Sequence, residues 1–143
     1  RLFASKGFAV LGFDIDESKV KSLTAGKSYI LSVPTATIAK LRKAKKLEAT
    51  SDFRRIGEVD AMIICVPTPL TPEGKPDLQP IVATTTAIAK NFHKGQLVVL
   101  ESTTYPGTTR EVMLPELERG GLKCGQDFFL AFCAKLASKS SAS

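Results

Sequence analysis

Four short apolar runs recur along the chain, and each is five or six residues long. They lie at residues 8–13, 61–66, 96–100 and 128–132, and Val, Ile, Leu, Ala and Phe dominate them. Runs of this length are short for buried helices and fit strands that are covered on both faces. The pattern therefore predicts the strands of a mostly parallel sheet.

Longer segments with apolar residues at helical spacing separate these runs. The predicted helices are residues 17–25, 35–46, 77–92 and 108–119. Asp16 is suited to cap the first helix and Gly26 to end it, whereas Pro115 must bend the last one because it lacks an amide proton. Residues 47–50 fit a short edge strand. Strands that alternate with helices predict βαβ units and an α/β fold.

A hydroxyl-rich loop follows the third apolar run. Residues 101–109 read Glu-Ser-Thr-Thr-Tyr-Pro-Gly-Thr-Thr, and a helical pattern begins directly after them. In open α/β sheets, ligands bind outside the carboxyl ends of the strands, so these hydroxyls are well placed to hold a polar ligand. The alternative is a Thr-rich turn that caps the next helix. The spacing alone leaves both interpretations open.

The positive charge of the chain is unevenly distributed. A length of 143 residues fits one domain, and the net charge is +6. Residues 35–55 hold seven Lys and Arg side chains against two acidic ones. This segment is either the solvated face of one helix or an anion- or nucleic-acid-binding patch. We favour the solvated face, because no nucleic-acid motif accompanies it, and we expect no nucleic-acid partner.

The cysteine and histidine content excludes several classes of site. The sequence has three cysteines and one histidine, and their spacing suggests neither a disulfide framework nor a zinc site. Cys65 is expected to be a buried small hydrophobe, and His93 a helix-end residue. No apolar run approaches the roughly 20 residues that span a bilayer. We expect a cytoplasmic protein that binds no metal and contacts no membrane.

Three segments, in the same order, resemble the nucleotide-sugar 6-dehydrogenases, which include the UDP-glucose and UDP-N-acetylglucosamine or mannosamine dehydrogenases. They are Val-Leu-Gly-Phe-Asp-Ile-Asp at residues 10–16, Ile-Ile-Cys-Val-Pro-Thr-Pro-Leu at residues 63–70, and the hydroxyl-rich loop. The resemblance covers residues 1–132. It implies a doubly wound, Rossmann-like parallel sheet and NAD as cofactor. Family enzymes oxidise the C6 alcohol of the sugar twice, to a uronic acid, and reduce two NAD molecules.

The resemblance also assigns residues to the adenosine end of the cofactor. Asp14 lies at the end of the first apolar run, where a carboxylate accepts hydrogen bonds from ribose hydroxyls and repels a 2′-phosphate. The sequence alone leaves open a helix-entry role for Asp14, for which Asp16 competes. Lys19 is placed near the cofactor by the resemblance alone.

The nicotinamide end is assigned in the same way. The resemblance places Pro67 and Thr68 against the nicotinamide, although a Pro-rich surface loop is the open alternative. It assigns Ser102 and Thr103 to cofactor binding, and Thr103 also to holding a catalytic water. Glu101 is expected to be a partly buried, hydrogen-bonded group and not a general base.

Two departures from the family pattern predict a fragment. In the strand order 3-2-1-4-5-6, residues 8–13 and 61–66 are strands 2 and 4, so strand 1 and the glycine-rich pyrophosphate turn would precede Arg1. After Phe132, the expected Ser-Pro-Glu is replaced by Cys-Ala-Lys. We therefore expect a partial NAD-binding domain at residues 1–132 and a divergent, disordered tail at residues 133–143. We also expect low stability, with apolar strand edges left unpaired.

Three functions follow, from different classes. The first is the NAD-binding domain of a UDP-sugar 6-dehydrogenase, inactive alone and homo-oligomeric when full length. The second is a non-catalytic remnant that binds a partner subunit. The third is an anion-binding module that uses the basic helix. From the resemblance, we expect the residues that would identify the sugar to lie outside this sequence.

Overall fold

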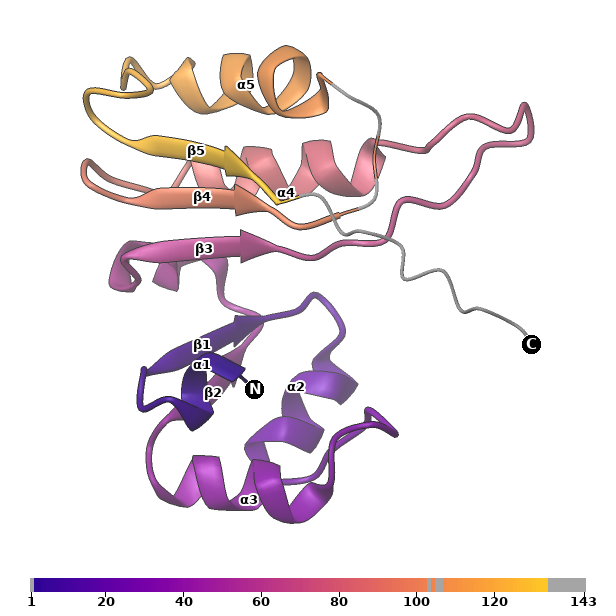
Figure 1. Cartoon of the computed structure of the whole chain (residues 1–143), viewed down its shortest axis with the longest axis vertical. Coiled ribbons are helices and arrows are strands. Elements are labelled where there is room, and N and C mark those ends of the chain that lie inside the picture. The colour runs from indigo at the N-terminus through magenta and orange to yellow at the C-terminus, as the bar shows by residue number, and fades with distance from the viewer. Residues whose placement is uncertain (1, 103, 105–106, 134–143) are drawn as a thin grey trace, which may run out of the picture. The chain divides into compact units, whose positions relative to one another are not determined.

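The computed structural model describes residues 2–102, 104 and 107–133 (Figure 1). The chain divides into two compact units, Arg1–Phe53 and Arg54–Ser143, and each unit is described separately below. Thr103 and the predicted tail from residue 134 onward lie outside the described residues. The predicted division into residues 1–132 and 133–143 stays a prediction.

The first unit contains a two-stranded parallel sheet with short helices. Strand β1 pairs with β2 in a register that places Val10 beside Leu47 and Phe13 beside Thr50. The elements are α1 (Leu2–Ser5), β1 (Val10–Phe13), α2 (Glu17–Thr24), α3 (Thr35–Lys43) and β2 (Leu47–Thr50). Among the described residues of this unit, the apolar side chains that are buried are Ala4, Ile38 and Leu41. So small a core provides little hydrophobic stabilisation.

Local residue chemistry explains where the helices of this unit begin and end. The Asp16 side chain caps α2, and Gly26 follows the helix with φ of +75°, as predicted from the sequence. Helix α3 ends at Lys43, earlier than predicted, because Lys45 adopts a left-handed φ of +53°. Basic residues occupy the last turn of α3, where they interact favourably with the helix dipole. This placement supports the solvated-face interpretation of the basic segment.

The second unit is a three-stranded parallel sheet covered by helices on one face. The strand order is β3-β4-β5, and Ile64, Leu100 and Phe132 lie in one register row. In Figure 1, α4 lies behind this sheet. The elements are a 3₁₀ helix (Phe53–Glu58), β3 (Ala61–Ile64), α4 (Gln79–Ala89), β4 (Leu97–Leu100), a π-helical turn (Thr109–Met113), α5 (Leu114–Glu118) and β5 (Phe129–Phe132).

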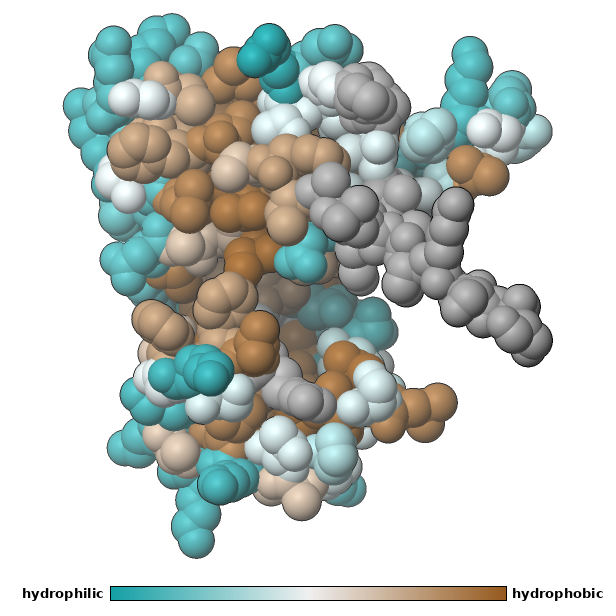
Figure 2. Space-filling view, viewed as in Figure 1, coloured by the Kyte–Doolittle hydropathy of each residue, from teal (hydrophilic) through white to brown (hydrophobic). Residues whose placement is uncertain are grey.

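The core of the second unit lies between one face of this sheet and its helices. Alternate strand residues are buried, together with apolar residues of α4, the π-helical turn and α5. With Ile56 of the 3₁₀ helix and Phe128 before β5, the buried set is Ile56, Met62, Ile64, Ile81, Ile88, Val98, Leu100, Met113, Leu117 and Phe128. The opposite face carries Ile63 and Phe129, both exposed, and apolar side chains gather over this sheet in Figure 2.

Pro115 has the effect that its missing amide predicts. It cannot donate a hydrogen bond to the preceding turn, and the chain widens into a π-helical turn immediately before α5. The 3₁₀ helix at Phe53–Glu58 was not predicted. The expected α/β fold with parallel strands is confirmed, and the pairings β1-β2 and β3-β4-β5 match the neighbours 2-3 and 4-5-6 of the order 3-2-1-4-5-6.

Candidate functional site

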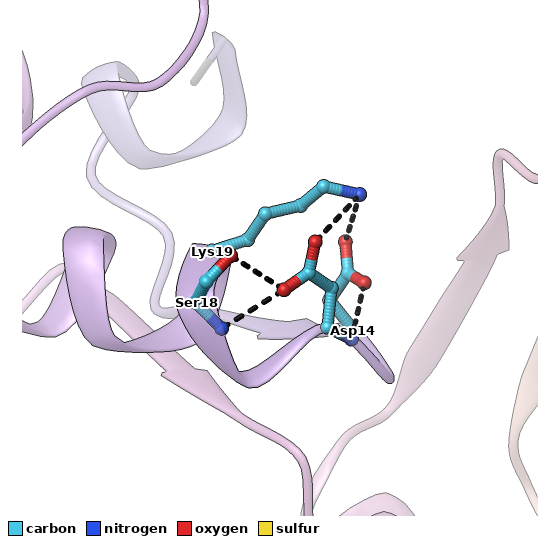
Figure 3. Close-up of polar contacts among 4 residues, drawn as sticks. Asp14, Ser18 and Lys19 are labelled. Carbon is cyan, nitrogen blue, oxygen red and sulfur yellow. Dashed lines mark hydrogen bonds and ion pairs between the residues drawn. The ribbon is translucent and has the colours of Figure 1, made fainter.

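A carboxylate cluster stands at the carboxyl end of β1 (Figure 3). Asp14 directly follows this strand, and one of its oxygens accepts the backbone N–H of Asp16 at 2.9 Å. The other oxygen lies 3.5 Å from the ammonium of Lys19. The backbone N–H of Asp14 donates to the Thr50 carbonyl, which holds the residue beside β2. The cluster is partly exposed, so its charges remain accessible to a ligand.

Asp16 has a different task from Asp14. Its carboxylate accepts the hydroxyl of Ser18 at 2.6 Å and the backbone N–H of Ser18 at 2.9 Å, so it caps α2. The Ser18 hydroxyl, followed by the Ser18 amide, holds the pKa of Asp16 below its ordinary value. The competition between Asp14 and Asp16 for the helix-entry role is therefore resolved in favour of Asp16. Asp14 retains the oxygen that faces Lys19.

A second group of polar side chains follows β3 and β4 at their carboxyl ends. The hydroxyl of Ser102 is buried and donates to the Val66 carbonyl at 2.8 Å. The backbone N–H of Glu101 donates to the Ile64 carbonyl, which extends the β3–β4 ladder by one residue. These bonds fasten the hydroxyl-rich loop to the segment that follows β3. Ser102 therefore donates a hydrogen bond that holds the loop in place, and its hydroxyl oxygen can still accept one.

Cys65 does not lie where the sequence predicted. The residue is exposed, and its Sγ lies 3.9 Å from a carboxylate oxygen of Glu101. The apolar run suggested burial, but Cys65 directly follows β3, two residues after the exposed Ile63. Alternation of side chains along a strand explains the error. Glu101 is partly buried, as expected.

The remainder of the hydroxyl-rich loop leads into the helical segment. The hydroxyls of Thr104 and Thr108 are hydrogen-bonded to each other at 2.7 Å, and Thr108 is buried. Gly107 adopts φ of +104°, and a Cβ there would lie 2.7 Å from a carboxylate oxygen of Glu111. The loop conformation therefore depends on glycine at this position. Thr103 lies outside the described residues.

Pro67 and Thr68 begin the loop between β3 and α4. Pro67 is exposed and Thr68 is partly buried. A bridge between Leu70 and Pro76 closes the rest of this loop into a hairpin-like excursion, visible at the right of Figure 1. Pro67 and Thr68 follow the carboxyl end of β3, where ligands of parallel sheets bind.

Gln96 is a supporting residue that sequence reasoning missed. It is fully buried, and its side-chain amide donates to the carbonyls of Ile56 and Val59 while its oxygen accepts the backbone N–H of His93 at 2.8 Å. These bonds fix the start of β4 and hence the origin of the hydroxyl-rich loop. A polar residue at the edge of an apolar run was the available signal.

The remaining features that the sequence raised are His93, metal binding and membrane crossing. The His93 ring contacts the carbonyls of Lys94 and Gly57 just after α4, which suits a helix-end residue. Within residues 2–102, 104 and 107–133, no cluster of three His, Cys, Asp or Glu side chains is arranged to hold a metal ion. In the same part of the chain, no helix has the length and apolar character required to cross a membrane.

The arrangement of polar groups at the carboxyl ends of parallel strands agrees with a comparison of sequences. Residues 1–142 match the UDP-glucose/GDP-mannose dehydrogenase family, NAD binding domain. The chain belongs to this family. The family resemblance and the fold predicted from the sequence are thereby confirmed, and NAD is the cofactor of the matched domain.

Relatives in the UDP-glucose/GDP-mannose dehydrogenase family are longer than this chain. It is 36% identical over 124 residues to UDP-N-acetyl-D-glucosamine 6-dehydrogenase of Pseudomonas aeruginosa, a match that covers 86% of this chain and 29% of the relative. It is 40% identical over 124 residues to protein CapL of Staphylococcus aureus, with 86% and 28% covered. The chain thus spans less than a third of either relative.

Solved structures of family members share the fold. The UDP-D-ManNAc dehydrogenase of Pyrococcus horikoshii superimposes with a TM-score of 0.85 at 33% identity, covering 92% of this chain and 31% of that one. A ternary complex of the GDP-mannose dehydrogenase of Pseudomonas aeruginosa gives 0.83 at 29% identity, with 90% and 31% covered. Both are Rossmann-type domains within longer enzymes, which supports the doubly wound topology.

Proposed function

We propose that this chain is the NAD-binding part of a nucleotide-sugar 6-dehydrogenase. The enzyme would oxidise the C6 alcohol of a UDP-sugar to a uronic acid and reduce two NAD molecules. The observation that carries the proposal is the match over residues 1–142 to an NAD-binding domain, together with an accessible carboxylate directly after β1. Relatives named for UDP-sugars support this class of substrate.

Asp14 would accept hydrogen bonds from the hydroxyls of the adenosine ribose. Its carboxylate follows a parallel strand, is partly exposed and uses only one oxygen to accept a backbone N–H. A carboxylate can accept several hydrogen bonds, so it has capacity for two neighbouring hydroxyls. Lys19, which lies beside it, would contact the same end of the cofactor.

The carboxyl end of the β3–β4–β5 sheet would supply the contacts to the nicotinamide half. Pro67 and Thr68 would line this half, Ser102 would accept a hydrogen bond with its remaining capacity, and Thr103 would bind the cofactor and hold a catalytic water. The hydrogen bond from Ser102 to Val66 supports this proposal, because it holds the beginning of the hydroxyl-rich loop beside the residues that follow β3.

Titration calorimetry with NAD tests the proposal. We expect the chain to bind NAD and the Asp14→Ala variant to bind it about tenfold more weakly, since hydrogen bonds to a charged group are lost. Asp77→Ala is the matched control, because the Asp77 carboxylate accepts a backbone N–H two residues ahead, as Asp14 does, in the loop before α4. Equal affinity of the chain and the Asp14→Ala variant would contradict the assignment of Asp14.

We further propose that the chain alone does not oxidise UDP-sugars. Lys135 stands where the family pattern places a catalytic glutamate, and an ammonium cannot accept a proton as a carboxylate does. The test is absorbance of NADH after mixing the chain with NAD and UDP-N-acetylglucosamine or UDP-glucose. No NADH is expected, and turnover would contradict the proposal.

A second candidate function is binding to an intact subunit of the same kind of enzyme, which would be homo-oligomeric when full length. The exposed side chains of Ile63 and Phe129, on the face of the sheet opposite α4, favour it. Co-purification of the tagged chain with a full-length relative is the test. Binding that is lost on Phe129→Ser supports this function, and absence of binding contradicts it.

A further inference from the structure

A cavity of about 360 Å³ lies in the first unit, where the ends of α2 and α3 meet β2 (Figure 1). Both helices contact this strand. Pockets that bind small molecules measure about 300–1,000 Å³, so the cavity has the size of a site for a small organic ligand. The lining residues are Thr24, Arg42, Lys45, Leu47, Glu48 and Ala49.

The cavity is separate from the carboxylate cluster at the carboxyl end of β1. Helix α2 shows this, because Asp16 caps its amino end beside Asp14, whereas Thr24 is its last residue. Eight residues of helix separate Asp16 from Thr24, about 12 Å along the axis. The lining residues of β2 are its first three, and the register places Leu47 at the amino end of the strand pair. A ligand in the cavity therefore need not compete with one at Asp14.

Two of the basic side chains in residues 35–55 line this cavity. The half-buried guanidinium of Arg42 donates one long hydrogen bond, of 3.5 Å, to the Leu47 carbonyl. Within the part of the chain that the structure describes, neither Arg42 nor Lys45 has an acidic partner. A guanidinium can hold a carboxylate or phosphate through two parallel N–H donors, and an ammonium adds a point charge beside it. The cavity thus offers an anion both a fork of donors and a second cation.

The backbone of Lys45 indicates that its side chain is the useful part of the residue. Its φ of +53° lies in the left-handed region, which glycine adopts without strain. Glycine at this position would end α3 with less strain than lysine does. What lysine adds is an exposed ammonium at the rim of the cavity.

The other lining groups restrict the kind of anion. Leu47 and Ala49 are half-buried apolar side chains, and Thr24 adds a hydroxyl. Glu48 brings one carboxylate against the two cations, so the lining carries a net charge of +1. The carboxyl ends of α2 and α3 are also negative ends of helix dipoles. This balance disfavours a polyanion such as nucleic acid and suits one anionic group on an apolar or hydroxylated body.

We propose that this cavity binds a small organic anion. Arg42 and Lys45 hold its carboxylate or phosphate group, and Leu47 and Ala49 contact its apolar part. The proposal goes beyond the proposed function and does not rest on it, because no residue assigned to NAD lines the cavity.

Nuclear magnetic resonance of the ¹⁵N-labelled chain tests the proposal with phenyl phosphate, benzoate and inorganic phosphate as probes. We expect amide shifts to change at residues 24, 42 and 45–49. Phenyl phosphate or benzoate should bind about tenfold more tightly than inorganic phosphate, because the ring is removed from water against the apolar wall. The tighter of the two identifies the anionic group. Added NAD should leave these affinities unchanged.

Lys45→Gly separates binding from folding. Glycine suits the left-handed backbone, so urea denaturation should show a chain at least as stable, while affinity for the better organic probe falls about tenfold. Arg42→Gln should weaken binding similarly. Lys43→Gln is the matched control, because Lys43 is an exposed cation in the last turn of α3 that does not line the cavity, and it should retain the affinity.

Four results would overturn the proposal. They are an affinity unchanged in both Lys45→Gly and Arg42→Gln, an equal loss in Lys43→Gln, organic probes that bind no more tightly than inorganic phosphate, and displacement of the probe by NAD. The second would indicate attraction to the overall positive charge, and the last would indicate a shared site.

Discussion

Replacing Gln96 by Met should destabilise the second unit, because the residue is a buried polar hub. The side chain is fully buried and joins the start of β4 to the carbonyls of Ile56 and Val59 and to the amide of His93. Among the described residues, every buried side-chain nitrogen or oxygen has a hydrogen-bond partner. Met has nearly the same length and volume but donates and accepts none of these bonds.

The size of the effect follows from where each bond lies. The bond to Ile56 is buried, and the bonds to Val59 and His93 are partly buried. A buried carbonyl left without a partner costs about 2 kcal/mol, and two groups that water reaches in part cost about 0.5 kcal/mol each. The expected loss in the free energy of unfolding is therefore about 3 kcal/mol, a large part of the stability of a small domain.

Urea denaturation followed by far-ultraviolet circular dichroism measures this loss. A change of about 3 kcal/mol moves the midpoint by about 2 M for a chain of this size. Gln126→Met is the matched control, because Gln126 is exposed and bonds only through its backbone N–H, and it should change the free energy by less than about 0.5 kcal/mol. A Gln96→Met midpoint equal to that of the control would refute the reasoning.

Three further predictions concern the local structures around the site. Asp16→Asn should make the free energy of unfolding depend less on pH in acid. The pKa of Asp16 is lowered from its ordinary value of 3.8, so the stabilisation by its carboxylate is complete above that pH and is lost as the pH falls through the lowered pKa. Urea titrations at several acidic pH values would detect the difference. Gly107→Ala should cost about 1–3 kcal/mol, because φ of +104° is strained for a residue with a Cβ, whereas Gly120→Ala, with open space around it and no positive φ, should cost little; thermal denaturation compares them. Ser102→Ala should cost about 1–2 kcal/mol by removing the bond to the Val66 carbonyl, and it should accelerate amide hydrogen exchange in the hydroxyl-rich loop.

Features with a local cause were predictable from the sequence. Asp16 and Gly26 mark the ends of α2 because capping depends on a few adjacent residues. The short strand at Leu47–Thr50 and the disturbance before Pro115 follow from β propensity and a missing amide. The family was predictable too, since its motifs are contiguous segments of sequence.

Features that depend on distant parts of the chain were not predictable. A polar residue at the edge of an apolar run marks Gln96 as a candidate, but its partner carbonyls lie about forty residues earlier in the chain and no local pattern identifies them. Cys65 lies in an apolar run, yet it follows the end of β3 and is exposed. The partition of tasks between Asp14 and Asp16 required the position of Ser18, which decides the cap.

The central claim is that this chain binds NAD through the carboxyl ends of its strands. Nuclear magnetic resonance of the ¹⁵N-labelled chain, titrated with NAD, tests it most directly. We expect amide shifts to change at residues 14–19, 101–105, 107 and 108. Unchanged spectra, or changes confined to the basic helix Thr35–Lys43, would contradict it, and the second result would favour an anion-binding module instead.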